Sequence, residues 1–168
     1  MGAGGGLPSL PILVARPEWH AVLLDASQKR CSFLVWAAGQ LGLSDRVDVW
    51  CGRAEEIGHE ERARFQFDAV VARGFGPPAA TVECGAPLLV PGGLLVISEP
   101  PTGRRWPPGP LAEAGMVVSA AAPADESSAS PEHRPVDGWS GVVVLRRDGD
   151  VPNSLPRRNK TQQRSPLF

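Results

Sequence analysis

Short apolar runs alternate along the chain with longer segments of helical spacing. Such runs have the length of strands, and most of their positions are apolar, as in buried strands. The alternation is typical of a mostly parallel sheet covered by helices, so we predict an α/β fold. The predicted strands are Ala21–Asp25, Val47–Cys51, Phe67–Ala72, Gly93–Ser98, Met116–Ala120 and Val142–Leu145.

Three segments between these strands are predicted as helices: Leu7–Arg16, Ser27–Leu41 and Pro78–Val90. The second is the best defined, because its apolar residues recur three and four positions apart and Gly42 follows as a stop signal. Pro91 and Gly92 predict a turn into the next strand. Together these elements predict one folded domain over residues 1–147.

Two stretches lack the pattern of either element. Pro100–Pro110 is rich in proline and is predicted as a rigid irregular connection. Ala121–Pro135 is rich in Ala, Ser, Pro and Glu and is predicted as a mobile loop. Residues 148–168 form a basic C-terminal tail, which composition alone assigns to a solvated end. Its clustered cations are Arg157, Arg158, Lys160 and Arg164.

Composition narrows the class of protein. The net charge of −1 gives no global argument for a nucleic-acid partner. The three cysteines are widely spaced, which argues against a disulfide framework and a zinc site, and His20, His59 and His133 show no metal-ligand spacing. We therefore predict no metal site. No segment has the length of a membrane span and no signal peptide is visible, so we expect a soluble cytoplasmic protein.

A glycine cluster, Gly2-Ala3-Gly4-Gly5-Gly6, stands directly before the first predicted helix. Glycines at such a position allow a backbone to approach a nucleotide closely. Asp25 follows about twenty residues later at a strand end, where a carboxylate can accept hydrogen bonds from ribose hydroxyls. This spacing leaves a nicotinamide cofactor and S-adenosylmethionine as alternatives.

Six blocks of the sequence are more specific. The residues of these blocks and their order along the chain resemble the RsmG/GidB family, which methylates N7 of a guanine in 16S ribosomal RNA. The resemblance implies a Rossmann-like class I methyltransferase fold, S-adenosylmethionine as cofactor, and 16S ribosomal RNA or the small ribosomal subunit as partner. The blocks are GAGGGLPSLPILVARP, LLDASQKRCSFL, GRAEE, FDAVVARGFGP, APLLVPGGLLV and PRRNKTQQRSPL.

The resemblance also implies roles for single residues. For the cofactor, it places the methionine end against the glycine loop, the ribose at Asp25, the adenine at Ala54 and Glu55, and Arg73 at the mouth of the site. For RNA, it implies contacts from the helix after Asp25 and from the basic tail. The cofactor residues are Gly2, Gly4, Gly6, Leu7, Asp25, Ala54, Glu55 and Arg73, and the RNA residues are Lys29, Arg30, Arg157, Arg158, Lys160 and Arg164.

No catalytic residue is assigned. Ser27 and Cys31 have no recognisable partners for nucleophilic catalysis. Methylation at N7 of guanine needs no general base, because that nitrogen carries a lone pair and no proton. Alignment and exclusion of water are then the tasks of the protein.

One part of the family pattern has no counterpart here. The usual loop reads acid-x-G-x-G-x-G, with the acid at the end of a central first strand, and this sequence starts at the x. We therefore expect the sheet to lack this strand, between Ala21–Asp25 and Phe67–Ala72, and the isolated chain to be unstable. A non-catalytic RNA-binding or relic protein is the main alternative. An NAD-linked oxidoreductase is disfavoured because the glycine loop is too compact and the chain has no tyrosine.

Overall fold

A computed structural model describes residues 1–98, 106–121 and 141–168. The predicted loop Ala121–Pro135, apart from its first residue, and most of the connection Pro100–Pro110 lie outside these ranges. The strands are β1 (Ala21–Asp25), β2 (Val47–Cys51), β3 (Phe67–Arg73), β4 (Leu89–Ser98), β5 (Met116–Ala121) and β6 (Val142–Arg147). The helices are α1 (Ser9–Ala15), α2 (Gln28–Gln40), α3 (Ala54–Ile57), α4 (Pro78–Gly85), the 3-10 turn η1 (Ala86–Leu88), α5 (Pro108–Glu113) and α6 (Asn159–Arg164).

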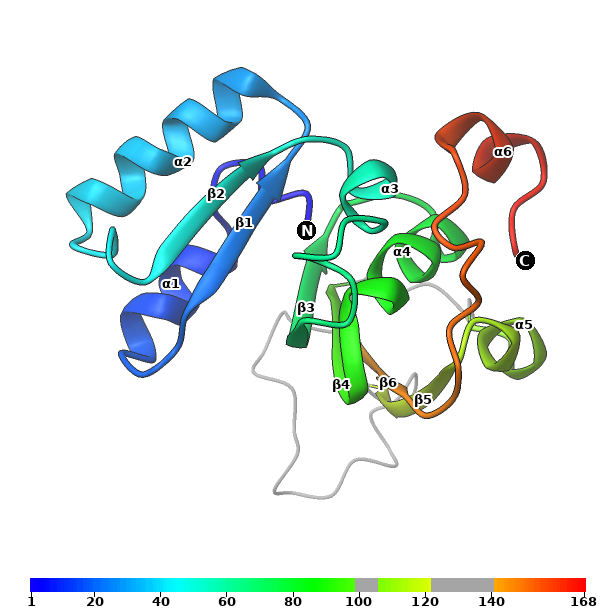
Figure 1. The fold of residues 1–168 in the computed structure, drawn as a ribbon. Helices are drawn as coiled ribbons and strands as arrows, with labels where there is room; N and C mark the ends of the chain where they lie inside the picture. Colours follow the sequence, from blue (N-terminus) through cyan, green and yellow to red (C-terminus); the bar gives the residue numbers. More distant parts are fainter. Residues whose placement is uncertain (99–105, 122–140) are drawn as a thin grey trace.

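The described strands form two separate sheets (Figure 1). The first holds β1 and β2 in parallel. The second has the order β3-β4-β6-β5, with β3 and β4 parallel and the other two pairings antiparallel. The α/β class is therefore confirmed. β1 and β3 are edge strands of different sheets, and the break falls where the sequence analysis placed the missing strand.

The first residues of the chain connect the two sheets. The Met1 amino group donates a hydrogen bond of 2.9 Å to the Val71 carbonyl of β3. The Ala3 N–H donates one of 2.9 Å to the Leu24 carbonyl of β1. Burial lowers the pKa of the Met1 amino group to about 6, while the negative charge of Asp25 opposes this shift. The N-terminus therefore lies between the sheets rather than in solvent (Figure 1).

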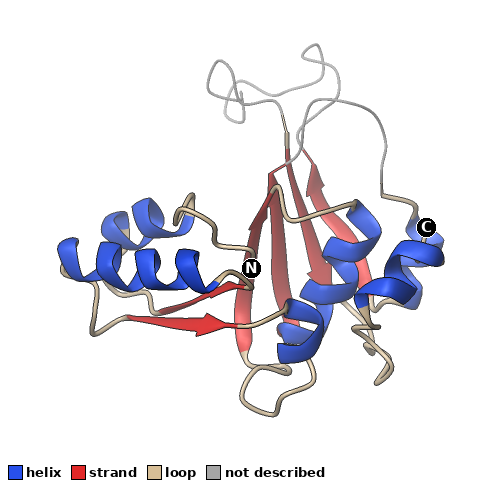
Figure 2. Ribbon diagram, turned by 90° about the horizontal axis from the view of Figure 1, so that it is seen from above, coloured by secondary structure: helices blue, strands red, loops and turns tan. Residues whose placement is uncertain are grey.

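The two-stranded sheet has a small core of its own. α1 and α2 lie on the same side of it (Figure 2), and Leu10, Leu13, Leu23 and Leu34 pack between these elements. Leu24, the next residue of β1, points to the opposite face and joins the larger core. This part of the molecule, residues 1–51, is called the β1–β2 half below.

The four-stranded sheet supports the larger core. Leu89, Leu95, Met116 and Leu145 are all fully buried within it. The side chains of β4 alternate, so that Leu95 is covered while Leu94 is 36% exposed on the other face. Residues 52–168, as far as they are described, are called the β3–β6 half.

Two helix predictions differ from the structure. Pro78–Val90 was expected to be one helix, but α4 ends at Gly85. The carbonyl of Pro87 accepts the Phe65 N–H at 2.9 Å, and Leu89 pairs with Phe67 in the sheet, so tertiary pairing overrides helical spacing here. Pro108–Pro110, expected to be irregular, begin α5, because a proline in the first turn lacks only an N–H that the helix does not use.

The C-terminal residues are also ordered. Val151 and Leu155 join the larger core, and α6 follows. These two apolar side chains, rather than the overall composition of the tail, decide its placement. The tail therefore packs on the β3–β6 half instead of forming a solvated end.

Candidate functional site

A cavity of about 640 Å³ opens where the carboxyl ends of β1, β2 and β3 meet the C-terminal tail. Ligands of open α/β folds bind at this edge of the sheet, and this volume is within the usual range for small-molecule sites. The lining residues are Gly2, Leu24, Asp25, Ala26, Arg30, Gly52, Arg53, Ala54, Glu55, Gly74, Phe75, Gly76, Pro77, Ala79, Ala80, Cys84, Asn159, Gln162, Gln163, Pro166 and Phe168.

The glycine loop needs its glycines for conformation and for space. Gly2 and Gly4 have φ angles of +61° and +57°, which favour glycine. A Cβ at Gly2 would also lie 2.8 Å from the ring of Phe75. The loop can therefore bring its backbone to the cavity wall without a side chain in between.

Asp25 fixes this loop at the end of β1. Its Oδ2 accepts the Gly4 N–H at 2.8 Å and its Oδ1 accepts the Ser27 N–H at 2.9 Å. A carboxylate has about four acceptor positions, so two hydrogen bonds leave capacity for others. The side chain is only 5% exposed and lines the cavity. Asp25 can thus accept hydrogen bonds from vicinal hydroxyls, as the predicted ribose contact requires.

The end of β2 lies beside the end of β1. The Gly52 N–H donates to the Asp25 carbonyl at 3.0 Å, which brings the start of α3 to the same cavity. Ala54 is buried, and Glu55 accepts a hydrogen bond of 2.6 Å from Arg53. This contact raises the pKa of the Arg53 guanidinium. The predicted adenine residues Ala54 and Glu55 therefore face the cavity together with Asp25.

Some of the residues predicted for the cofactor lie outside the lining. Gly4 supports Asp25 from the loop, whereas Gly6 faces Leu10 and Leu34, where a Cβ would clash with Leu10. Leu7 is 51% exposed. Arg73 ends β3 in an exposed position, and the following residues Gly74–Gly76 reach the cavity instead.

The tail contributes a wall that the sequence analysis missed. Asn159, Gln162 and Gln163 of α6 and the terminal Phe168 line the cavity. The prediction for the tail rested on its basic residues and their contact with RNA. It did not consider the uncharged carboxamide side chains that lie between them. The side chain of Gln162 donates to the Arg157 carbonyl at 2.8 Å, so the wall is held from inside.

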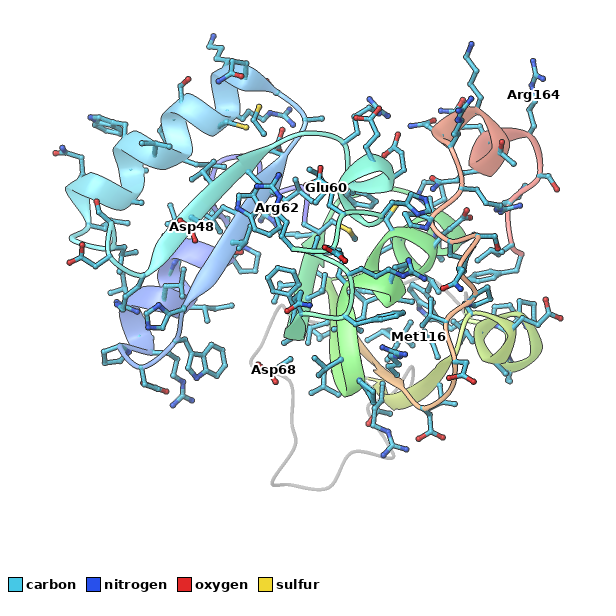
Figure 3. The ribbon with its side chains drawn as sticks, in the orientation of Figure 1. Asp48, Glu60, Arg62, Asp68, Met116 and Arg164 are labelled. Atoms are coloured by element: carbon cyan, nitrogen blue, oxygen red, sulfur yellow. The ribbon has the colours of Figure 1, made fainter. Side chains whose placement is uncertain are left out.

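Arg157 fastens the tail to α4. Its Nε and Nη2 donate to the two carboxylate oxygens of Glu83 at 2.7 and 2.8 Å, and its backbone N–H donates to one of them at 2.8 Å. Glu83 is fully buried, and its hydrogen bonds with the Arg157 side chain raise the pKa of Arg157. Arg158, Lys160 and Arg164 are exposed, and Figure 3 shows Arg164 pointing away from the body of the molecule.

The cysteine in the cavity is not an activated nucleophile. Burial raises the pKa of Cys84 to about 12, so its thiol stays protonated near neutral pH. Within the described ranges, no group of His, Cys, Asp and Glu side chains could hold a metal ion. None of the helices described here has the length and apolar content to cross a membrane.

Residues 1–99 match the GidB family, whose description is rRNA small subunit methyltransferase G. The ribosomal RNA small subunit methyltransferase G of Sorangium cellulosum is 36% identical over 159 residues, covering 94% of this chain and 61% of the relative. The protein of that name from Deinococcus radiodurans is 32% identical over 169 residues, covering 100% and 64%. The chain therefore spans less than two thirds of the length of these relatives.

Two solved structures share the fold. The antibiotic-resistance methyltransferase Kmr has a TM-score of 0.64 at 12% identity, covering 89% of this chain and 84% of Kmr. The cyclase SpnF has a TM-score of 0.59 at 19% identity, covering 89% and 74%. Since one is a methyltransferase and the other a cyclase, these likenesses concern the architecture alone.

Proposed function

Because the chain belongs to the rRNA small subunit methyltransferase G family, we propose that its cavity binds S-adenosylmethionine and directs a methyl group to N7 of a guanine in 16S ribosomal RNA. The observation that carries this proposal is the convergence of the glycine loop, Asp25 and the start of α3 on one cavity. A ribosomal RNA substrate also assigns the protein to the cytoplasm, with the small ribosomal subunit as partner.

The residues present fit the cofactor. Asp25 has free acceptor capacity for the ribose hydroxyls, Ala54 and Glu55 offer a place for the adenine, and Gly2 leaves room for the methionine end. When bound, S-adenosylmethionine supplies a methyl group on a sulfonium leaving group. Gly4, through its hydrogen bond to Asp25, would position the carboxylate, and Arg73, which precedes the cavity residue Gly74, would stand at the mouth of the site.

The remaining work of the protein is alignment. N7 of guanine carries a lone pair, so no side chain has to remove a proton, and the protonated Cys84 is consistent with this chemistry. The walls from the glycine loop and from α6 would hold the base in line with the methyl group and exclude water. Proximity and orientation can account for about 7–11 kcal/mol of a reaction barrier.

RNA would approach over the exposed cations. Lys29, Arg158, Lys160 and Arg164 are exposed, and Arg30 lies at the cavity. Phosphate contacts from such side chains position an RNA without reading its sequence. Arg157 was predicted to share this role, but its guanidinium is paired with Glu83, which favours a role in anchoring the tail.

The cofactor part is tested by calorimetric titration with S-adenosylhomocysteine. Asp25→Ala should weaken binding by about 1–3 kcal/mol, the scale for lost hydrogen bonds to a charged group. Asp48→Ala is the matched control, because Asp48 is an exposed carboxylate on β2 outside the cavity lining (Figure 3). Equal affinities for the parent and Asp25→Ala would remove Asp25 from the site.

The substrate part is tested by transfer of labelled methyl groups to 16S ribosomal RNA and by the salt dependence of RNA binding. Replacing Arg158, Lys160 and Arg164 by glutamine should lower the slope of log affinity against log salt by about 0.7 per lost contact with single-stranded RNA. The control replaces the exposed Arg16, Arg62 and Arg146, which changes the net charge equally. RNA binding without methyl transfer would favour the non-catalytic alternative.

A further inference from the structure

α2 carries a solvent-facing stripe that the packing of the helix does not use. Lys29, Phe33 and Trp36 are spaced four and three residues apart, so they lie on one face. Phe33 is 43% exposed and Trp36 is 60% exposed. Their ring centroids are 5.7 Å apart with an interplanar angle of 41°. We call these three residues the α2 stripe.

Phe33 and Trp36 are not part of the hydrophobic core of the β1–β2 half. The buried face of α2 consists of Cys31, Leu34, Ala37 and Ala38, which pack toward the sheet. A surface helix normally presents charged and polar residues to water. Adjoining exposed aromatic side chains on such a surface are a feature of interaction sites.

The helix that carries the stripe is positively charged. α2 contains Lys29 and Arg30 and no acidic residue. Arg30 also lines the cavity, with its Nη1 3.7 Å from the Asp25 carboxylate. A helix rises about 1.5 Å per residue, so Trp36 lies about 9 Å along α2 from the cavity wall at Arg30. Figure 1 shows α2 on the outer side of the β1–β2 half, away from α6.

We propose that the α2 stripe stacks unpaired RNA bases that neighbour the nucleotide in the cavity, while Lys29 and Arg30 contact their phosphates. This inference rests on the proposed RNA substrate. Aromatic side chains beside cations are the usual platform for single-stranded nucleic acid, because every base has a face that can stack. The stripe would thus hold the strand on the side of the cavity opposite the tail.

The test is the affinity of the full chain for an unpaired oligoribonucleotide of mixed sequence, measured by fluorescence anisotropy. Trp36→Leu keeps an apolar side chain but removes the aromatic face, and should weaken binding about tenfold. Trp36→Phe keeps a ring and should restore most of the affinity. Trp19→Leu is the control, because Trp19 is 49% exposed but lies outside α2. The salt dependence should be unchanged in Trp36→Leu and weaker in a Lys29→Gln, Arg30→Gln variant.

Several outcomes would contradict the proposal that the α2 stripe stacks RNA bases. Equal affinities of the parent, Trp36→Leu and Trp36→Phe would do so while leaving the proposed function in place. Tighter binding of the same RNA as a duplex than as a single strand would also contradict base stacking. If sedimentation shows that the parent chain is a dimer and that the Trp36→Leu variant is a monomer, the α2 stripe is instead an interface between two copies of the chain. Cofactor binding with no RNA binding at all would refute the substrate class and the platform together.

Discussion

The two halves of the molecule differ in how completely each one encloses its hydrophobic core. The β3–β6 half surrounds a continuous core with strands, helices and the tail, and its central leucines are fully buried. The β1–β2 half has two strands and a smaller core, and its α2 leaves Phe33, Val35 and Trp36 exposed. The candidate cavity takes walls from both halves. The glycine loop and Asp25 come from the β1–β2 half, and the start of α3 and the α6 wall come from the β3–β6 half.

The two halves contribute different kinds of residue to the site. Gly2 and Asp25, on the β1–β2 half, present backbone and carboxylate groups to the cavity. Gln162 and Cys84, on the β3–β6 half, are buried groups that shape the wall. We infer that the wall is stable without a ligand, whereas the loop is the part that responds to one.

The largest expected effect concerns the attachment of the tail to the β3–β6 half. Arg157→Ala would leave the fully buried Glu83 without its guanidinium partner. Removing one member of a buried ion pair costs about 3–5 kcal/mol, so the free energy of unfolding should fall on that scale. Urea denaturation measures it.

The matched control is Arg146→Ala. Arg146 and Asp148 form an ion pair at 2.8 Å, but their side chains are 48% and 54% exposed. Exposed pairs contribute about 0–1 kcal/mol, so this variant should differ little from the parent. Similar losses for both arginines would contradict the assignment of Arg157 as an anchor.

The next effect compares the two cores directly. Leu34 and Leu145 are both fully buried, one in each half. Each Leu→Ala change should destabilise its core by about 2–5 kcal/mol. Amide hydrogen exchange should show that Leu34→Ala lowers protection in β1, β2 and α2 and leaves β4 and β6 unchanged. Uniform loss of protection would mean that the halves open as one unit.

The smallest effect is a difference in local opening between the halves. Burial raises the pKa of Cys31 to about 11 and that of Cys84 to about 12, so in the folded state both thiols stay protonated at pH 8. With the exposed Cys51 replaced by serine, both remaining thiols are buried, at 3% and 1% exposure, and Cys84 borders the cavity, so the reaction is run with S-adenosylhomocysteine bound and then reports local opening of the structure. We expect Cys31 to react about tenfold faster than Cys84, a difference of about 1.4 kcal/mol. Equal reaction rates of Cys31 and Cys84 would show that the two halves do not differ in local opening.

Local patterns predicted the elements that local interactions decide. The strand bounds Ala21–Asp25 and Val47–Cys51 were confirmed residue by residue, because short apolar runs bounded by turns have few alternatives. The end of α4 and the course of the tail were missed. Both depend on contacts between distant residues, such as Phe65 with Pro87 and Arg157 with Glu83, which leave no periodic signal in the sequence.

The candidate site divides in the same way. Of the predicted loop and ribose residues, Gly2 and Asp25 lie at the cavity, and they were predicted because a glycine cluster and a strand-ending acid have a recognisable spacing. The carboxamides of α6 were missed because their role depends on where the chain returns after its last strand. Whether each of these residues binds the cofactor stays a prediction.

Met1 and Ala3 join the two sheets by backbone hydrogen bonds to β3 and β1, and a ligand that contacts both halves would strengthen this link as its concentration rises. A molecule that touches Asp25 on one side and the α6 wall on the other acts as a reversible cross-link, whose contribution grows as RT ln(1 + [L]/Kd), about 2.7 kcal/mol at a hundredfold excess over Kd. At low occupancy the two sheets would melt as two transitions, and at saturation these transitions would merge. The cellular supply of the small molecule would then set whether this chain behaves as one cooperative body or as two loosely joined ones.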